Sequence, residues 1–301
     1  MSVLIVGSTN MDISATMERF PKKGETLLGD GIRYQYGGKG ANQACALGKL
    51  GAEATFLTCV GDDSYGHEMV DYLKSTGVNM DRVKYSSTHR TGTAIINVDA
   101  QGDNTIVVIQ GANLDCDVEY IRANEDCFRD CDYVLLQMEI PFDAIEEAIV
   151  LAVKYGKKVI LNPAPASDRL PKELYRYITY MTPNEVEAQV MAGGGASPEQ
   201  NAEKLLELGV QNVLVTLGSE GARMYSKNNK SIYVPAYKVD AVDTVAAGDC
   251  FNGAFAVALD RGDGEEEAMK FANRASAIAV TRRGAQKSIP TKEEMETMSF
   301  C

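Results

Sequence analysis

Histidine is scarce in this chain, and long apolar runs are missing. The 301 residues include only two histidines, His67 and His89, which are far apart and lack ligand-like spacing. Zinc-dependent and Ser-His hydrolase chemistry therefore has little support. No apolar run approaches the roughly 20 residues that a membrane-spanning helix needs. The first residues, MSVLIVGSTN, lack a basic segment followed by a cleavable apolar stretch. We therefore expect a cytoplasmic protein that is neither membrane-spanning nor secreted.

Positive charge is also in short supply. Lysine and arginine number 30 against 42 aspartates and glutamates, which gives a net charge of −12. Nucleic acid is not expected as a partner, because its binding requires a dense positive surface. A small anion is still compatible, since a cleft can bind phosphate through backbone N–H groups and one or two cations. The seven cysteines are odd in number and lie in apolar stretches, which is typical of buried thiols in a reducing cytosol.

Two common nucleotide-binding motifs are absent. Gly37-Gly38-Lys39-Gly40 has no Ser or Thr after the lysine and no glycine at the required distance before it, so it is not a GxxxxGK[ST] loop. The first apolar run is followed by Gly-Ser-Thr-Asn rather than GxGxxG. An NAD-linked enzyme with a Rossmann unit is therefore disfavoured.

Apolar, β-rich runs alternate with helical patterns along most of the chain. The predicted strands are Val3–Gly7, Ala54–Val60, Tyr133–Gln137, Lys158–Leu161, Ile178–Thr182 and Asn212–Leu217. The predicted helices are Gly40–Leu50, Tyr65–Thr76, Phe142–Tyr155, Pro198–Leu208, Gly248–Arg261 and Gly264–Thr281. This alternation indicates an α/β protein with a mostly parallel sheet covered by helices on both faces. Ligands should bind at the carboxyl ends of the strands.

Two regions interrupt the alternation with pairs of short strands. The segments Ile13–Met17 and Ile32–Tyr36, and likewise Thr93–Val98 and Thr105–Gln110, are predicted as short strands with no helix between them. They either form a small separate sheet or extend the edge of the main sheet. A separate sheet would act as a lid over the site, and its apolar outer face would pair with a second subunit. We predict a single domain over residues 1–301, with lid strands from about 12–37 and 91–112.

The segment Asp243–Asp249 has the most informative chemistry. Small residues at Ala246, Ala247 and Gly248 lead directly into an amphipathic helix, so the free N–H groups at its start can bind phosphate oxygens. Asp249 is either an ordinary helix-start carboxylate or, beside bound phosphate, a proton acceptor. The glycine-rich segment 37–43 is either a plain turn into a helix or a place where the backbone approaches a ligand, with Lys39, Asn42 and Gln43 as donors.

These segments together resemble the ribokinase family of carbohydrate kinases over essentially the whole chain. The resemblance rests on the order of six motifs, and it is far more specific than any single one. They are Gly37–Ala44, Asn162–Ala166, Asn184–Glu187, Thr216–Ser219, Asp243–Gly253 and Ala279–Gln286. Ala246 stands where many sugar kinases of the family have glycine, and Val245 replaces a frequent Thr or Ile. Because the backbone carbonyl matters at position 245, we expect little consequence there.

The resemblance implies a three-layer α/β/α fold with a small β-sheet lid and an ATP-dependent kinase of D-ribose that acts at the 5-hydroxyl. It implies that Asp249 is the base and that the N–H groups of Ala246, Ala247 and Gly248 form the anion hole. The sugar would contact Asn10, Asp12, Gly38, Lys39, Asn42, Glu139 and Asp249. ATP would contact Asn184, Thr216, Gly218, Ser219, Gly221, Gly248 and Asn273.

Two cations and a partner subunit are also implied by the resemblance. Glu187 would act on Mg²⁺ through water. A K⁺ ion would be held by the side chains of Asp243 and Ser288 and by the carbonyls of Val245, Ala279, Arg282 and Gly284. The protein would be a homodimer through its lid sheet. Two alternatives are a kinase for another pentose, a ketohexose or a nucleoside, and a catalytically silent sugar- or nucleotide-binding regulator. The carboxylates of Glu187 and Asp249 speak against the second, because a silent relative has no chemical need for them.

Overall fold

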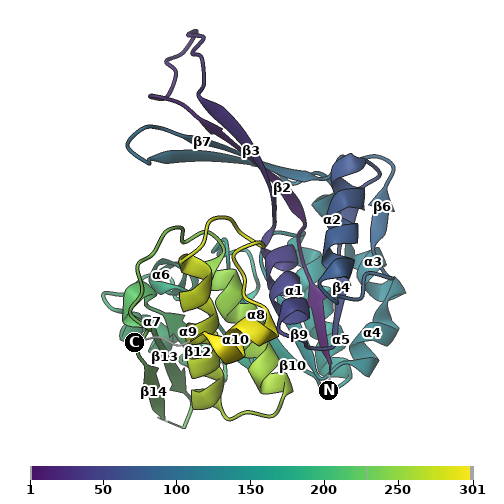
Figure 1. The fold of residues 1–301 in the computed structure, drawn as a ribbon. Coiled ribbons are helices and arrows are strands. Elements are labelled where there is room, and N and C mark those ends of the chain that lie inside the picture. The colour runs from purple at the N-terminus through teal and green to yellow at the C-terminus, as the bar shows by residue number, and fades with distance from the viewer. Residues whose placement is uncertain (1, 229, 299–301) are drawn as a thin grey trace.

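A twisted sheet of eight strands forms the centre of the molecule (Figure 1). The computed structural model describes residues 2–228 and 230–298 of the chain. The sheet order is β14 (Ser231–Val234), β13 (Ala222–Ser226), β12 (Asn212–Thr216), β11 (Tyr180–Met181), β10 (Lys158–Leu161), β9 (Tyr133–Leu136), β1 (Val3–Val6) and β4 (Ala54–Leu57). The strands from β12 to β4 are parallel, and the β13–β14 hairpin is antiparallel. The predicted, mostly parallel sheet is confirmed.

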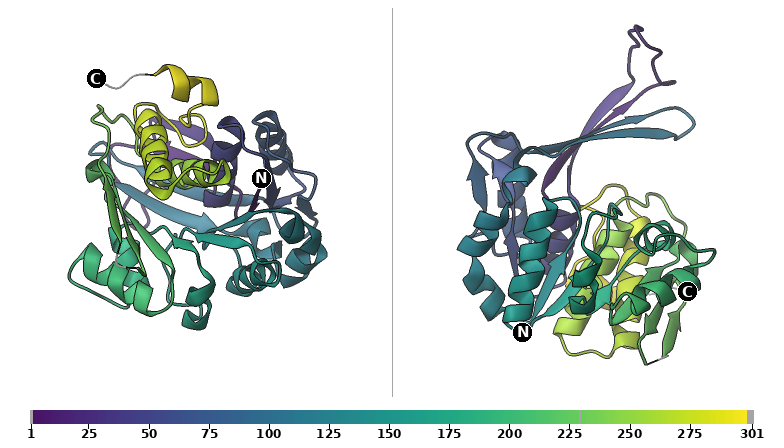
Figure 2. Two further views of the ribbon diagram at one scale, coloured as in Figure 1. Left: turned by 90° about the horizontal axis from the view of Figure 1, so that it is seen from below. Right: turned by 180° about the vertical axis from the view of Figure 1, so that it is seen from behind.

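Helices cover both faces of this sheet and complete three layers (Figure 2). One face is covered by α1 (Lys39–Lys49), α2 (Ser64–Ser75), α8 (Ala247–Asp260), α9 (Glu265–Val280) and α10 (Lys292–Thr297). The other is covered by α3 (Val118–Ala123), α4 (Glu125–Asp130), α5 (Phe142–Lys154), α6 (Glu185–Met191) and α7 (Pro198–Glu207). Short 3₁₀ helices are η1 (Gly111–Asp115), η2 (Lys172–Tyr177) and η3 (Gly218–Glu220).

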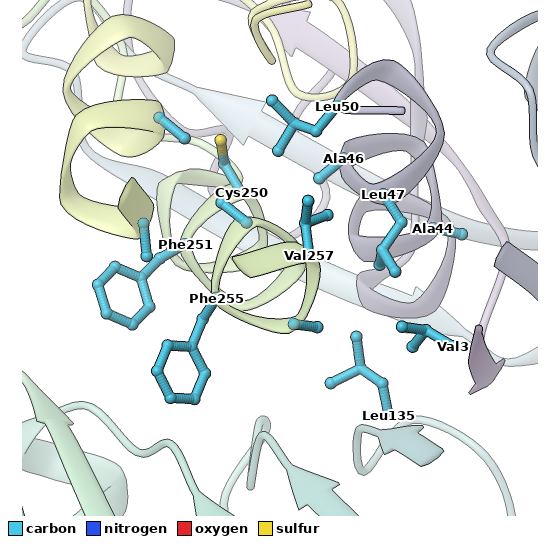
Figure 3. Close-up of a cluster of buried hydrophobic side chains, with 14 of the residues drawn as sticks. Val3, Ala44, Ala46, Leu47, Leu50, Leu135, Cys250, Phe251, Phe255 and Val257 are labelled. Atoms are coloured by element: carbon cyan, nitrogen blue, oxygen red, sulfur yellow. The ribbon is translucent and has the colours of Figure 1, made fainter. Parts of the chain in front are cut away.

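Two hydrophobic cores lie between the sheet and its two helical layers. Successive residues of β1 alternate between them: Val3 and Ile5 belong to one core, and Leu4 and Val6 belong to the other. This division follows from the two-residue period of a strand, whose side chains point to opposite faces. Figure 3 shows the first core, in which Phe251 and Phe255 of α8 and Leu47 of α1 converge on the sheet. The packing places the N-termini of α1 and α8 close to each other, as the contacts of the site show below.

The two interrupting regions form a separate four-stranded sheet, so the alternative of an extended main sheet is wrong. Its order is β3 (Gly31–Gly37), β2 (Asn10–Thr16), β7 (Gly92–Val98) and β8 (Asn104–Ile109). The sheet projects from the body on the side where β1 ends (Figure 1). All six residues of β8 are exposed, including four consecutive apolar ones at 106–109.

The structure differs from the predicted elements in several places, and the short helices α3, α4, α6 and α10 are not among the predicted ones. The predicted strand Ala54–Val60 breaks at Thr58, after which β5 (Cys59–Gly61) pairs with β6 (Lys84–Ser86) in a sheet of its own. The break has a polar cause, because Thr58 bonds the hydroxyl of Thr9 and its carbonyl accepts the Tyr120 hydroxyl. The strand at Ile178–Thr182 is shorter than predicted, and the β13–β14 hairpin was not predicted at all.

The six described cysteines are free thiols, and five of them are buried; Cys301 lies outside the described residues. Buried thiols without disulfides agree with the expectation from their number and surroundings. Within the described ranges, no helix is long and apolar enough to cross a bilayer.

Candidate active site

Polar residues follow the carboxyl ends of five parallel strands and meet at one edge of the main sheet. Asn10 comes after β1, Glu139 after β9 and Asn162 after β10. Asn184 follows β11, and Ser219 follows β12. Carboxyl ends of neighbouring parallel strands share one edge, so the fold brings these distant segments together. The predicted location of the site is therefore supported by the sheet topology.

Asp249 lies buried in the first turn of α8, with only 7% of its surface exposed. Its Oδ2 accepts a hydrogen bond from Asn42 Nδ2 at 2.9 Å, and its Oδ1 accepts one from Gln43 Nε2 at 3.1 Å. Burial raises the pKa of the Asp249 carboxyl, against the opposing effects of Lys39 and the two amides. A buried carboxylate with a raised pKa and oriented lone pairs is equipped to accept a proton.

The turn before Asp249 has an unusual backbone. Ala246 is the N-cap of α8 and has φ 58° and ψ 13°, the only positive φ among the described non-glycine residues. No side chain caps this helix end, which leaves the Gly248 N–H available to an anion, whereas the Ala247 N–H donates to the Thr244 carbonyl at 3.2 Å. A cavity of about 210 Å³ lies against the turn, and its walls include Ala246, Ala247, Gly248 and Asp249. The structure thus brings the four predicted catalytic residues to one cavity.

Lys39 faces that cavity and interacts with four carboxylates. Burial by itself would lower the pKa of its ammonium group, but the charges of Asp249, Glu139, Glu187 and Asp12 raise the pKa. Lys39 therefore stays protonated and supplies the positive charge of the site. Its backbone N–H also donates to Glu139 Oε2 at 3.0 Å.

Asp12 occupies the sugar side of the predicted site. Burial raises the pKa of its carboxyl to about 7, with further contributions from Glu139 and Asp249. A Cβ added to Gly37 would lie 2.2 Å from Asp12 Oδ2, so only glycine leaves room for this carboxylate. Gly38 has φ 86°, and a Cβ there would lie 2.7 Å from the backbone N of Asn10. These glycines are required because the turn packs against its own chain.

Asn10 is buried, and another residue that sequence reasoning missed holds it in place. Its Oδ1 accepts from Asn113 Nδ2 at 2.7 Å. The Oδ1 of Asn113 accepts the backbone N–H of Thr9 at 2.9 Å. Asn113 thereby fixes both the loop after β1 and the orientation of the Asn10 amide. No local signal distinguishes Asn113, since it comes from η1, about a hundred residues away in the sequence.

A second cavity of about 550 Å³ lies on the other side of the α8 N-terminus. Thr244 and Ala247 border both cavities. Gly218, Ser219 and Asn273, three of the residues predicted to contact ATP, line the larger one. Its other walls are largely apolar and include Ala236, Val239, Ala241, Ala277 and Val280. An apolar cavity next to free helix N–H groups suits a flat base joined to phosphates.

Three other predicted nucleotide residues have different positions. Asn184 and Thr216 pair through an isolated β-bridge and line the smaller cavity. Gly221 does not border either cavity; it has φ 109°, and a Cβ there would lie 2.2 Å from the Val234 carbonyl oxygen. Gly221 thus serves the packing of the β13–β14 hairpin. Asn273 Nδ2 donates to the carbonyls of Val234 and Pro235. These bonds hold the start of the segment 236–241, which lines the larger cavity.

Asn184 and Glu187 form a capping box at the start of α6. Asn184 Oδ1 accepts from Glu187 N, and Glu187 Oε2 accepts from Asn184 N, both at 2.8 Å. The N-x-x-E pattern therefore has a structural role of its own. Burial raises the pKa of Glu187, although the Asn184 N–H and Lys39 act against this. Its carboxylate still lines the smaller cavity, where it can bind a hydrated cation.

The segments predicted to hold a monovalent cation also lie together. Asp243 Oδ1 accepts from Val245 N at 3.0 Å, and Asp243 Oδ2 accepts from Gly284 N at 2.9 Å. The Ala279 carbonyl accepts the Arg282 N–H, and the buried Ser288 hydroxyl donates to the Ala285 carbonyl. Carbonyl and hydroxyl oxygens keep a free lone pair after one such bond, so this oxygen-rich set fits a cation. The Arg282 guanidinium pairs with Glu294, which leaves only its backbone for the predicted role.

Comparisons with known proteins agree along the whole chain. The model of the pfkB family of carbohydrate kinases matches residues 1–292. The ribokinase of Schizosaccharomyces pombe is 41% identical over 98% of this chain and 97% of its own length. Among solved structures, a ribokinase from Thermotoga maritima has a TM-score of 0.90 with 41% identity, covering 98% of this chain and 97% of that one. Arabidopsis thaliana ribokinase, complexed with ribose and ATP, has a TM-score of 0.89 with 32% identity and covers 99% of both chains.

Proposed function

The chain belongs to the pfkB family of carbohydrate kinases, and on this premise we propose that it transfers the γ-phosphoryl group of ATP to the 5-hydroxyl of D-ribose. The observation that carries the proposal is the buried Asp249 at the uncapped N-terminus of α8, where two cavities meet. The names of the relatives support ribose as the acceptor, as does the Arabidopsis complex with ribose and ATP.

The proposed reaction begins with the sugar beside Lys39 and Asp249, at the border of the smaller cavity. Asn10, Asp12, Gly38, Lys39, Asn42 and Glu139 would hold its hydroxyls. Asp249 takes the proton of the 5-hydroxyl as that oxygen attacks the γ-phosphorus, and the bond to the β-phosphate oxygen breaks. The N–H groups of Ala246, Ala247 and Gly248 stabilise the charge on the transferring group. Phosphoryl transfer depends chiefly on positioning and electrostatics, so one carboxylate and an anion hole are sufficient for the reaction.

Two cations complete the proposal. Glu187 would hold Mg²⁺ through water, and bound Mg²⁺ would neutralise phosphate charge. Asp243 and the carbonyls of the 279–284 segment, with Ser288, would hold K⁺. The support for K⁺ is that Asp243 links the anion-hole segment to Gly284 directly.

We also propose that the small sheet closes over the sugar and mediates a homodimer. Residues paired in register lie on the same face of a sheet, so Tyr34, Ile95 and Val107 share the face opposite to Asp12. These three side chains are 54%, 42% and 60% exposed. A second copy of the sheet would cover this apolar face, and closure would keep water from hydrolysing ATP. The protein would then act as a single catalytic domain with a lid.

A coupled assay of ADP release tests the function. The panel should contain D-ribose, 2-deoxyribose, D-fructose and a nucleoside, each with ATP and Mg²⁺. Ribose is expected to give the highest kcat/KM, because a substrate that lacks a hydroxyl leaves a buried polar group unpaired, at a cost of about 1–3 kcal/mol. A nucleoside or fructose above ribose would assign another acceptor, and no ADP release with any of them would contradict kinase activity.

A further inference from the structure

We propose that Gln43 is a positioning residue that holds the Asp249 carboxylate in its working orientation. The inference rests on the proposed function, in which Asp249 is the base. Gln43 lies on α1, is fully buried, and has no surface from which it could contact solvent. Its side-chain amide is the centre of a hydrogen-bonded chain that joins Asp249 to the ends of two strands of the main sheet.

The contacts of this amide are complete. Gln43 Nε2 donates to Asp249 Oδ1 and to Asn162 Oδ1, each at 3.1 Å. Gln43 Oε1 accepts from Gln137 Nε2 at 2.7 Å. Gln137 directly follows β9, and Asn162 directly follows β10. The base on α8 is thereby tied to two strand ends at the edge of the sheet that are distant from it in the sequence.

The direction of the Gln43 amide follows from an unambiguous acceptor. Asn162 Nδ2 donates to the backbone carbonyl of Thr182 at 3.0 Å, and a carbonyl can only accept. The Oδ1 of Asn162 must therefore face Gln43, and Gln43 must present its NH₂ group. The same NH₂ group then meets Asp249. The chain of contacts leaves one consistent arrangement in which Gln43 donates to the base.

This arrangement limits what the carboxylate can do. Asn42 holds one oxygen of Asp249 and Gln43 holds the other, so the group cannot rotate about its Cβ–Cγ bond without losing both contacts. The lone pairs that remain are available to accept the proton of the substrate hydroxyl. A carboxylate that is held in one orientation accepts the proton faster than one that rotates, because small errors in orientation lower the rate of proton transfer. Donation to the carboxylate also favours its ionised form.

The test replaces Gln43 by methionine, which keeps the volume and removes both donors. The first measurement is the titration of the Asp249 carboxyl by ¹³C NMR, with its resonance assigned by its loss in Asp249→Asn. In Gln43→Met the pKa of Asp249 should rise, and the acidic limb of the kcat profile should move to higher pH with it. We expect kcat to fall about tenfold to a hundredfold, with KM for ribose nearly unchanged. The other charged groups near Asp249 are Lys39, Glu139, Glu187 and Asp12, and all four stay in the variant.

Two further variants keep the test decisive. Gln137→Met removes the support of Gln43 without touching Asp249, so it should shift the titration and kcat in the same direction by less. Asn124→Ala is the control, since this buried amide bonds only within α3 and should affect stability without moving the Asp249 titration. An unchanged titration and kcat in folded Gln43→Met would overturn the inference, and where that variant is unfolded, an unchanged Gln137→Met does so. Wild-type protein that releases no ADP overturns the proposed function instead, while the NMR titration still decides the role of Gln43.

Discussion

At the scale of single residues, Asp249 is the side chain on which the proposed chemistry depends most. Asp249→Asn keeps the size of the side chain and removes the proton acceptor. We expect kcat to fall by about 10²–10⁴-fold, the usual contribution of a general base, with ribose binding and the melting temperature little changed. Steady-state ADP release and calorimetric binding of ribose measure these two quantities.

The matched control for this variant is Asp260→Asn, at the last residue of the same helix. It makes the same chemical change at the far end of α8 and should leave kcat as in the wild type. Near-normal turnover in Asp249→Asn would remove Asp249 from the role of base.

Asp12 gives the site a dependence on pH. Because its pKa is raised to about 7, the ionised fraction falls about tenfold between pH 8 and pH 6. If the ionised form accepts hydrogen bonds from ribose, KM should rise up to about tenfold over that interval, and the rise should vanish in Asp12→Asn. A KM that is flat between these pH values in the wild type would contradict the assignment of Asp12.

The raised pKa of Asp12 also makes the stability of the folded protein depend on pH. The folded-state pKa of Asp12 lies above its ordinary value of 3.8, so the protein binds this proton more tightly when folded. The resulting stabilisation is fully present below about pH 3.8 and is lost as the pH rises through about 7. Asp12→Asn should therefore raise the melting temperature at about pH 8, with no gain at about pH 4, as thermal unfolding at the two pH values would show.

At the scale of elements, the start of α8 depends on two segments that adjoin it. Asp243 bonds the N–H groups of Val245 and Gly284 and so connects the anion-hole turn to the segment after α9. A monovalent cation bound there would stabilise the left-handed turn at Ala246 through the oxygens around it. We expect kcat in K⁺ buffer to exceed kcat with Na⁺, and both to exceed kcat in a buffer with only bulky organic cations.

Asp243→Asn should reduce the activation by K⁺, because it removes the negative charge of the proposed cation ligands. Asp240→Asn is the control, since it makes the same change nearby in the sequence. ADP release over a K⁺ titration measures both variants. Equal rates in K⁺ and in tetramethylammonium would exclude a functional cation at these segments.

At the scale of the whole molecule, the small sheet has an edge strand, β8, that is exposed along its whole length. Val107→Glu would place a charge on the sheet's apolar outer face, in the edge strand β8. We expect the wild type to be a dimer and this variant to be a monomer, as measured by light scattering after gel filtration. Val150→Glu, at an exposed valine on α5, makes the same change elsewhere and should stay dimeric. Wild-type protein that is monomeric at all concentrations would refute the proposed interface.

The sequence by itself determined the features that depend on neighbouring residues. Alternating strand and helix patterns predicted the parallel sheet, and the limits of α5 and β10 agree with the structure to within a residue. Small residues before Asp249 predicted an uncapped helix start for the same reason, because free N–H groups at a helix end are a local property. The order of the motifs was sufficient to identify the family.

Only the tertiary structure decided which polar groups meet. Nothing near Gln43, Gln137 or Asn113 marks these amides among the others in the chain, and their partners lie about a hundred or more residues away. The break of the predicted strand at Thr58 and the packing role of Gly221 likewise depend on distant contacts. Periodicity and capping are set along the chain, whereas hydrogen bonds in a buried site are set by the sheet order that brings separate strand ends to one edge.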